Sequence, residues 1–334
     1  NHRLRNRARI ENYKTVDDAI NLLQSAQRVM VLTGAGISVA CGIPDFRSSD
    51  GIYARIKASG QYEDLDDPQE MYVKLVVAYY ETQILRQGRP PNSQLWPKDV
   101  QPSVSHKFIR LLEAKNKLLR NYTQNIDSME SIAGVERVFY CHGSFATAKC
   151  MDCQNEVTGS TIHDDVVQGK VPRCPPCVKK KPKRKRKKGS RPWDEEEESE
   201  SDSQRDMPLA GVMKPGITFF GEKLSDNFDN LLYVDREEVD LLLIIGTSLK
   251  VKPVSEILAH IPHSVPQILI NKTPVEHVNP DIVLLGDCER IIEYLCDGLG
   301  WVIPSKGDDL TQSRQKRKSE ELGNNTNPER LGDR

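Results

Sequence analysis

A short apolar strand that runs directly into a glycine loop sets the strongest limit on how this chain can fold. Residues 28–33 (RVMVLT) read as a buried strand, and residues 34–38 (GAGIS) follow at once. Glycines between a strand and a helix let backbone N–H groups approach a diphosphate, whose charge the helix N-terminus favours. The loop therefore indicates a dinucleotide site. The alternative for a G-x-G sequence taken alone is a tight turn without a ligand.

Two departures separate this loop from that of an ordinary dehydrogenase. Val39 stands where the third glycine of G-x-G-x-x-G belongs. The ribose-binding acid expected about 20 residues further on is absent from residues 52–55 (IYAR). The loop thus suits a dinucleotide phosphate, while the ribose must be recognised elsewhere.

A second loop follows at residues 42–47 (GIPDFR) and carries Asp45, Phe46 and Arg47. An acid, an aromatic ring and a guanidinium beside a phosphate site predict a lid that closes on the cofactor. The plainer alternative is a surface loop held by an ion pair.

Strands and helices alternate along much of the chain. Thr15 and Asp18 have capping-box spacing and open a helix, and further helices are expected at residues 106–115, 254–260 and 288–296. Between them, strands are expected at 118–123, 137–140, 217–220, 241–245, 267–271 and 282–285. This alternation predicts an α/β fold with a Rossmann-like, doubly wound parallel sheet. An apolar stripe (Met71, Leu75, Val76, Tyr79, Leu85) interrupts it with a helical insertion.

These patterns predict the following domain organisation. A flexible segment (1–14) precedes a Rossmann-like nucleotide-binding domain built from residues 15–49, 102–143 and 216–304. A smaller domain combines a helical module (50–101) with a zinc ribbon (144–178). A disordered charged insert (179–210) and a disordered tail (305–334) complete the chain. The chain starts at Asn1 without a methionine, so it is expected to be a fragment.

Four of the eight cysteines form two C-x-x-C pairs, Cys150 with Cys153 and Cys174 with Cys177. Four thiolates at this spacing suit a tetrahedral Zn²⁺ ion in a reducing compartment. No ligand position is left open for water, so the predicted ion is structural. A redox dithiol is the alternative, and two pairs at this spacing count against it.

Charge is balanced overall but is concentrated locally. The net charge is −1, which gives no general attraction to nucleic acid or membrane. No apolar run approaches the roughly 20 residues that a membrane span needs. The basic run 179–188 predicts a nuclear import signal, with a solvated loop as the alternative, and the acidic run 194–202 argues against direct DNA binding. Three serines among the acids (Ser199, Ser201, Ser203) are candidate phosphorylation sites.

Taken in order, the motifs resemble those of the sirtuins from about residue 15 to 304. They are the two loops above, residues 123–127 (TQNID), 142–143 (HG), the cysteine pairs, 214–222 (KPGITFFGE), 246–249 (GTSL) and 286–288 (GDC). The likeness is greatest to the nuclear, silencing-type branch, the silent information regulator group. One departure is the long charged stretch between Cys177 and Lys214, which affects domain boundaries only.

The resemblance implies an NAD-dependent protein-lysine deacetylase that consumes NAD as a co-substrate. Acetyl-lysine would enter a tunnel between the Rossmann domain and the zinc module. Its amide oxygen would attack the nicotinamide ribose carbon, nicotinamide would leave, and a histidine would act as base on the ribose hydroxyl. The products would be nicotinamide and 2′-O-acetyl-ADP-ribose. By family analogy the substrates are histone tails, the partners are chromatin silencing proteins, and the location is the nucleus.

The resemblance also implies roles for individual residues. His142 would be the base, since an imidazole suits proton abstraction at neutral pH, and Asn125 would act with it at the nicotinamide end. Co-substrate contacts would come from Gly34, Ala35, Gly36, Ser38, Asp45, Phe46, Arg47, Gln124, Asn125, Ile126, Asp127, Gly246, Thr247, Ser248, Asn271 and Cys288. The apolar tunnel and the strand edges that pair with the peptide would come from Ile217, Phe219, Gly221, Glu222, Leu249 and Val251.

Three alternatives remain open at this point. An ADP-ribosyltransferase or a longer-chain deacylase would use the same NAD site. A non-catalytic chromatin scaffold would bind NAD or nothing. A dehydrogenase is disfavoured by the missing third glycine and the missing acid.

Overall fold

The computed structural model describes residues 7–45, 48–49, 51, 54, 100–167, 170–179, 211–218, 222–252 and 254–303. The chain divides into two compact units. Unit 1 comprises Asn1–Ala54, Asp99–Cys141 and Leu224–Arg334, and unit 2 comprises Arg55–Lys98 and His142–Lys223. Nearly all of the predicted helical module, nearly all of the charged insert and the whole predicted tail lie outside the described residues. No helix among the described residues is long and apolar enough to cross a bilayer.

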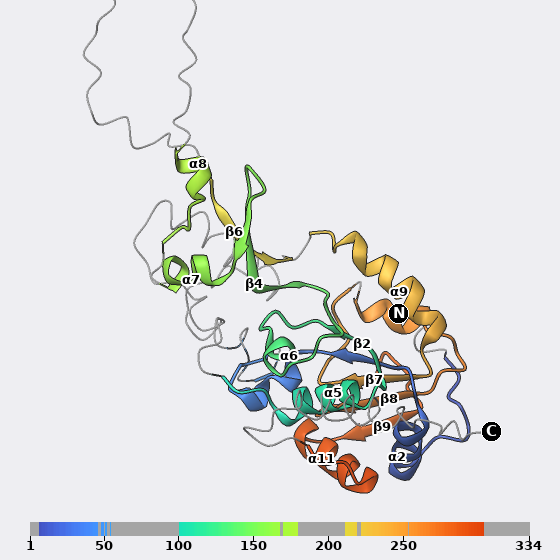
Figure 1. Ribbon diagram of the computed structural model, residues 1–334. Coiled ribbons are helices and arrows are strands. Elements are labelled where there is room, and N and C mark those ends of the chain that lie inside the picture. The colour runs from blue at the N-terminus through green and yellow to red at the C-terminus, as the bar shows by residue number, and fades with distance from the viewer. Residues whose placement is uncertain are drawn as a thin grey trace, which may run out of the picture. The chain divides into compact units, whose positions relative to one another are not determined.

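A six-stranded parallel sheet forms the centre of unit 1 (Figure 1). Its strands are β1 (Val29–Thr33), β2 (Leu118–Thr123), β3 (Val138–Tyr140), β7 (Leu241–Ile245), β8 (Gln267–Asn271) and β9 (Ile282–Leu285). They lie in the order β3-β2-β1-β7-β8-β9. The chain therefore adds β2 and β3 on one side of β1, and then β7, β8 and β9 on the other side. This is the doubly wound order of dinucleotide-binding folds, and it confirms the predicted fold class.

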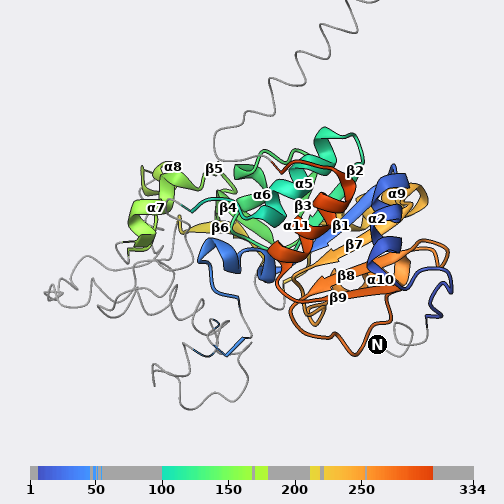
Figure 2. The same ribbon diagram turned by 90° about the horizontal axis from the view of Figure 1, so that it is seen from below.

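Helices cover both faces of this sheet because its strands are apolar on both sides. The helices α2 (Val16–Ser25), α5 (Val104–Ala114) and α11 (Cys288–Leu299) pack with Val31 and Leu243 on one face (Figure 2). The helices α9 (Asp226–Glu238) and α10 (Ile257–His260) pack with Leu32 and Ile244 on the other. Each fully buried aliphatic side chain stabilises the fold by about 1.5–3 kcal/mol.

Helix ends follow local capping chemistry. The capping box at Thr15 is present, with the Asp18 N–H donating to the Thr15 hydroxyl at 3.1 Å and the Thr15 N–H donating to the Asp18 carboxylate at 2.8 Å. Helix α5 begins two residues before the predicted start, because Ser103 caps it and His106 supplies the reciprocal bond. The spacing of apolar residues does not predict helix α9, because only Phe228 and Leu232 of that helix belong to the hydrophobic core.

The glycine loop and the residues directly after it form two short 3₁₀ turns, η1 (Ala35–Ile37) and η2 (Val39–Cys41), where a helix is the usual continuation. Gly42 ends the second turn in the left-handed conformation, with φ of 82°. A further 3₁₀ turn, η4 (Val254–Glu256), leads into α10, and the short helix α6 spans Met129–Ile132.

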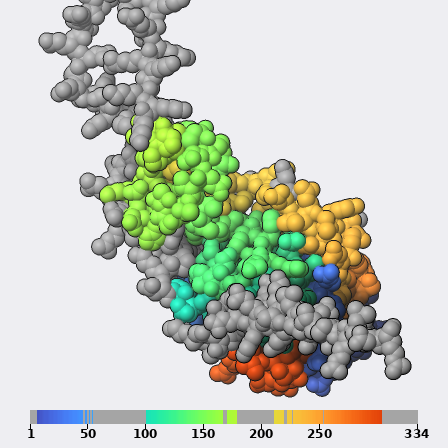
Figure 3. Space-filling view, in the orientation of Figure 1, coloured from blue at the N-terminus to red at the C-terminus, as the bar shows by residue number. Residues whose placement is uncertain are grey.

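Unit 2 contains a three-stranded antiparallel sheet in the order β5-β4-β6. Its strands are β4 (Gly143–Cys150), β5 (Glu156–Thr158) and β6 (Met213–Ile217), and its helices are α7 (Ser160–Val167) and α8 (Pro175–Lys179). In the space-filling view the yellow-green atoms, which include helices α7 and α8, gather in one patch (Figure 3).

The prediction of a strand at residues 217–220 in the parallel sheet is wrong. The observed strand is β6, which ends at Ile217 and pairs antiparallel with β4, with Met213 opposite Cys150. Burial alternates along β6, as expected for a strand with one covered face, whereas β1, β7 and β8 of the parallel sheet are buried along their whole length. Gly216, Ile217 and Thr218 accordingly belong to unit 2.

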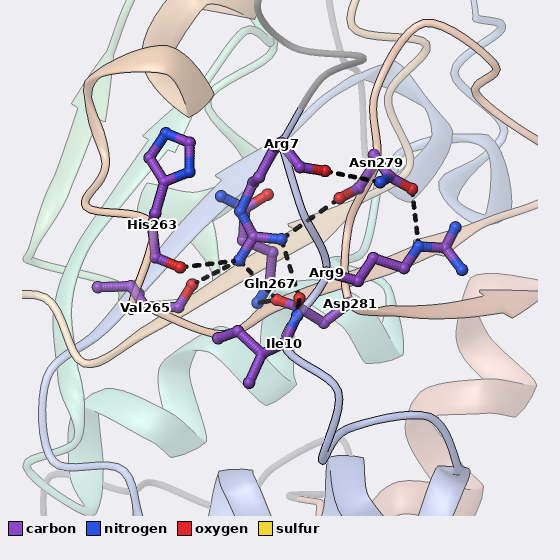
Figure 4. A network of polar contacts seen from close by, with 8 residues as sticks. All are labelled: Arg7, Arg9, Ile10, His263, Val265, Gln267, Asn279 and Asp281. Carbon is purple, nitrogen blue, oxygen red and sulfur yellow. Dashed lines mark hydrogen bonds and ion pairs between the residues drawn. The ribbon is translucent and has the colours of Figure 1, made fainter.

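The prediction that residues 1–14 are loosely held is wrong for residues 7–10. The Arg7 side chain is only 7% exposed, and its guanidinium binds both carboxylate oxygens of Asp281 at 2.8 and 2.9 Å (Figure 4). It also donates to the carbonyl of Val265 at 3.1 Å. The same carboxylate accepts the backbone N–H groups of Ile10 and Gln267. A buried charge persists only where it is paired and hydrogen-bonded, and the loop before β9 supplies that partner.

Removing the Asp281 carboxylate is expected to destabilise unit 1 strongly. Asp281→Ala leaves the Arg7 guanidinium buried without its partner, so the free energy of unfolding should fall by about 3–5 kcal/mol. Urea unfolding monitored by circular dichroism measures this loss. Arg9→Ala is the matched control: Arg9 makes an exposed hydrogen bond to Asn279, and its loss should change stability by at most about 0.5 kcal/mol. An Asp281→Ala effect below about 1 kcal/mol, the range of exposed ion pairs, would contradict the buried pairing.

Candidate active site and metal centre

The glycine loop lies at the point where the strand order of unit 1 reverses. β1 pairs with β2 on one side and with β7 on the other. The Gly34 N–H donates to the Ile245 carbonyl at 3.2 Å and the Gly36 N–H donates to the Gly246 carbonyl at 2.8 Å. In open parallel sheets, ligands bind outside the carboxyl ends of the strands at such a switch point.

Gly36 is required here by the close approach of two backbones. A Cβ atom at this position would lie 2.7 Å from both the Cα and the carbonyl oxygen of Gly246. A side chain at residue 36 would therefore force the loops after β1 and β7 apart. The glycines at this position therefore serve loop packing, because they let the two backbones lie side by side.

The loop after β2 joins these two loops through side-chain hydrogen bonds. The Gln124 amide donates to the Thr247 hydroxyl at 2.9 Å. The Asn125 amide donates to the Gly34 carbonyl at 3.2 Å and approaches the Ser38 hydroxyl at 3.3 Å. Three loops that are distant in sequence therefore form one polar surface at the carboxyl ends of β1, β2 and β7.

A buried polar pair lies at the centre of this surface. The Ser38 hydroxyl donates to the Asp127 carboxylate at 2.7 Å, and the Met129 N–H donates to its other oxygen at 3.0 Å. Burial raises the pKa of Asp127, and these two hydrogen bonds oppose that rise. Asn125 and Asp127 are each 6% exposed, while Ile126 between them is half-buried.

The predicted adenosine contacts lie around the ends of β7 and β8. Asn271 ends β8, and its amide donates to the Thr273 carbonyl at 2.8 Å. Cys288 begins α11, and burial raises the pKa of its thiol to about 11, so it remains a neutral thiol. Thr247 is buried and Ser248 half-buried.

The remaining residues predicted to bind NAD or the substrate include Asp45, Leu249 and Val251 of unit 1. Asp45 is half-buried and accepts the Ser48 N–H at 3.0 Å. Leu249 is buried, and both its N–H and its carbonyl are already hydrogen-bonded within unit 1, to Thr247 and His277. Val251 is half-buried. Phe46, Arg47, Phe219 and Gly221 lie outside the described residues.

His142 begins the second segment of unit 2 and is half-buried in the turn between β3 and β4. Its carbonyl accepts the Thr218 N–H at 2.7 Å. Gly143 follows with φ of +69°, and a Cβ atom there would overlap the Gly216 carbonyl. The His-Gly pair is therefore tied to the end of β6 by backbone contacts.

Two predicted substrate residues lie at and after the end of β6. Ile217 is buried at the end of the strand. Glu222 is exposed and forms an ion pair with Lys214 at 2.6 Å.

The four paired cysteines converge in unit 2. Cys150 ends β4, Cys174 precedes α8 and Cys177 lies within it. All four sulfur atoms lie within 4.8 Å of one another. The Cys150 and Cys177 sulfurs are 3.8 Å apart and those of Cys153 and Cys174 are 3.6 Å apart.

This cysteine cluster has the dimensions of a tetrahedral thiolate site. Zinc–sulfur bonds of about 2.3 Å give sulfur–sulfur edges of about 3.8 Å in a tetrahedron, which matches the observed separations. The sulfurs are much too far apart for disulfides, and all four cysteines are free. The structure therefore confirms the predicted four-cysteine site, and its residues fit Zn²⁺.

Two further side chains, Glu130 and His106, lie in the polar centre of unit 1, and no sequence motif marks either of them. Both Glu130 and His106 are fully buried, and a ring nitrogen of His106 and a carboxylate oxygen of Glu130 each lie within 4.8 Å of a carboxylate oxygen of Asp127. Glu130 comes three residues after the TQNID motif. Nothing in the local sequence indicates that either side chain points inward.

Comparison with known proteins places the chain in a family. Residues 34–253 match the model of the Sir2 family. The chain is 45% identical over 298 residues to "NAD-dependent protein deacetylase sirtuin-1" of Rattus norvegicus, covering 88% of this chain and 47% of that protein. It is 41% identical over 323 residues to "NAD-dependent histone deacetylase SIR2" of Saccharomyces cerevisiae, covering 95% of this chain and 56% of that protein. The chain thus spans about half the length of these curated relatives.

A solved structure supports the same fold. The structure described as "Structural Basis for the Mechanism and Regulation of Sir2 Enzymes" superposes with a TM-score of 0.60 at 22% identity, covering 87% of this chain and 99% of that one. At this identity the likeness concerns the fold alone. Because the family model matches well over half of its residues, the chain belongs to the Sir2 family.

Proposed function

We propose that the chain is an NAD-dependent protein-lysine deacetylase that releases nicotinamide and 2′-O-acetyl-ADP-ribose. The observation that carries this proposal is the buried Ser38–Asn125–Asp127 group at the switch point of the sheet. The family assignment and the names of the two relatives, both NAD-dependent deacetylases, support it.

The residues of unit 1 suit the parts of NAD as follows. The glycine loop at Gly34, Ala35 and Gly36 would lie beside the diphosphate, with Asp45, Phe46 and Arg47 closing over it. Asn125 and Asp127 would bind the nicotinamide carboxamide, since an amide needs both donors and acceptors, and Ser38, Gln124 and Ile126 would lie beside them. The adenosine half would be held by Gly246, Thr247, Ser248, Asn271 and Cys288.

The acetylated substrate would be bound by residues near the end of β6 and after β7. Ile217 and Phe219 would form an apolar wall, which suits the neutral acetyl-lysine stem better than a charged lysine. Backbone groups of Gly221, Glu222 and Val251 would pair with the peptide as an added strand. Leu249 would not pair with it, because its N–H and its carbonyl are already hydrogen-bonded within unit 1. His142 would accept the proton of the ribose hydroxyl. Histone tails are the proposed substrates, because the yeast relative is named a histone deacetylase.

Mass spectrometry of the products tests this function directly. The chain is incubated with NAD and an acetyl-lysine peptide, and the expected products are deacetylated peptide, nicotinamide and an acetylated ADP-ribose. Transfer of ADP-ribose to protein would instead identify a transferase. Faster turnover of succinyl or myristoyl peptides would identify a longer-chain deacylase. Release of no nicotinamide would favour a non-catalytic scaffold.

We further propose that the chain acts in the nucleus with chromatin silencing proteins. The motivation is the basic run at residues 179–188 together with the histone deacetylase names of relatives. Replacing the lysines and arginines of this run by glutamine is expected to reduce nuclear accumulation of a fluorescent fusion several-fold, because import signals are read through clustered positive charge. Microscopy of cells measures this. The matched control replaces the second basic cluster, residues 314–318 (RQKRK). Unchanged accumulation in the first variant would refute the import role.

A further inference from the structure

Three ionisable side chains lie buried together beneath the polar surface of unit 1. They are Asp127, Glu130 on α6 and His106 on α5, with exposures of 6%, 0% and 0%. One ring nitrogen of His106 and one carboxylate oxygen of each acid lie within 4.8 Å of one another. No ion pair joins either acid to a lysine or arginine in the described part of the chain. The protonation states of Asp127, Glu130 and His106 therefore depend on one another and on their hydrogen bonds.

Hydrogen bonds determine which nitrogen of His106 carries the proton. The Ser103 N–H donates to Nδ1 at 3.2 Å, so Nδ1 is an acceptor and the ring proton lies on Nε2. Burial lowers the pKa of His106 to about 3, so the ring is neutral at pH 7. Nε2 is buried and has no hydrogen-bond partner. A nitrogen that bears a proton offers no lone pair to a metal, so this tautomer argues against a cation site here.

The two acids differ in how well the protein supports a negative charge on them. Asp127 receives hydrogen bonds from the Ser38 hydroxyl and the Met129 N–H. No hydrogen bond of normal geometry reaches either oxygen of Glu130, and the weaker approach of the Thr123 and Thr33 hydroxyls lowers its pKa less than burial and the Asp127 charge raise it. Hydrogen bonds to the charged form favour ionisation, and two carboxylates in one dry site do not both ionise. The single charge therefore belongs on Asp127.

The other titratable groups that face the cluster do not alter this assignment. Burial raises the pKa of Tyr140 and of Cys141, and it raises the pKa of Cys41 to about 11. All three are therefore neutral at pH 7 and offer no compensating positive charge. Burial, followed by the charge of Asp127, raises the pKa of Glu130 to about 8.

We propose that Glu130 is a positioning residue that stays protonated at neutral pH and so leaves the only negative charge of the cluster on Asp127. The ionised Asp127 carboxylate would accept a hydrogen bond from the N–H of the nicotinamide carboxamide. The proposal rests on the proposed function for its link to nicotinamide, but the placement of the proton does not. Glu130 would touch neither substrate nor NAD, and would act only through Asp127.

Infrared titration of the ligand-free protein tests the placement of the proton. The wild type should show the C=O stretch of a protonated carboxyl group at pH 7, and the band should disappear near pH 8. Glu130→Gln should lack this band. In Asp127→Asn the band should disappear at a lower pH, because the neighbouring charge is gone. Absence of the band in the wild type at pH 7, or its persistence in Glu130→Gln, would overturn the proposal.

Nicotinamide binding tests the link to Asp127. Asp127→Asn should weaken binding roughly tenfold or more, since it removes a charged acceptor. Glu130→Gln should weaken it much less, because a neutral amide replaces a neutral acid. Equal losses in the two variants would overturn the proposal. If the wild type binds no nicotinamide while the infrared titration behaves as expected, the proposed function fails and the proton assignment stands.

A matched control and a metal assay complete the test. Glu113→Gln removes another buried acid, but Glu113 is ion-paired with Arg110 at 2.9 Å, so this variant should lose stability and keep the infrared band. Elemental analysis should find no metal that depends on Glu130. A second metal ion per chain that disappears in Glu130→Gln would overturn the proposal in favour of a cation site.

Discussion

Replacing His142 by alanine is expected to lower the rate of deacetylation by about 10²–10⁴-fold, the range that general acid–base catalysis contributes. His142 is held between β3 and β4 by the hydrogen bond from Thr218 to its carbonyl and by the Gly143 turn. Both are backbone features, so alanine at residue 142 should preserve the local fold. The loss should therefore be one of chemistry, and it is measured as kcat on an acetyl-lysine peptide.

Two measurements separate this role from a structural one. The base is proposed to act after nicotinamide has left, so exchange of labelled nicotinamide into NAD should fall much less than deacetylation. His163→Ala is the matched control, because His163 lies on α7 of the same unit and pairs with the exposed Asp164. His163→Ala should leave kcat within a factor of about two, because His163 is half-buried on α7 and has no proposed role in the reaction. Unchanged deacetylation in His142→Ala would exclude His142 as the base.

Removing the metal from the cysteine cluster is expected to unfold the ribbon of unit 2 and to leave the sheet of unit 1 intact. Apparent binding free energies of structural zinc are about 10–16 kcal/mol. The hydrophobic cluster beside the cysteines is small, with Ala148, Ile162, Val166 and Met213 as its buried members other than cysteines. A core of this size does not stabilise a fold without a metal or a disulfide.

Amide hydrogen exchange before and after chelation measures this effect. Protection should be lost in β4, β5 and α7 and should be retained in β1, β7 and β8, whose side chains belong to separate cores. Cys174→Ser should reproduce the loss and release the metal, because Cys174 is fully buried in the cluster. Cys41→Ser is the control, since Cys41 is free and lies outside the cluster. Continued protection of β4 after complete chelation would contradict a structural role for the metal.

Many local features of the fold are readable from the residue pattern. The apolar runs at β1, β7 and β8 are buried on both faces, so their hydrophobicity is continuous and easy to recognise. The capping box at Thr15 depends on two residues three positions apart. The C-x-x-C spacing brings each cysteine pair together within one turn. Each of these signals arises from neighbours in sequence.

Other features depend on contacts between distant segments. β6 joins the small sheet because it pairs with β4, and no residue of β6 specifies that partner alone. Arg7 is buried because Asp281, 274 residues away, receives its guanidinium.

The motifs along the chain were sufficient to indicate a doubly wound sheet, a four-cysteine site and the family resemblance, since periodicity and spacing are properties of short segments. Tertiary packing decided which ionisable side chains are buried away from water. Glu130 and His106 have ordinary sequence surroundings, and only the convergence of α5, α6 and the loop after β2 removes them from water. The physical reason is that desolvation and charge–charge interaction depend on distance in space, which a linear sequence does not contain.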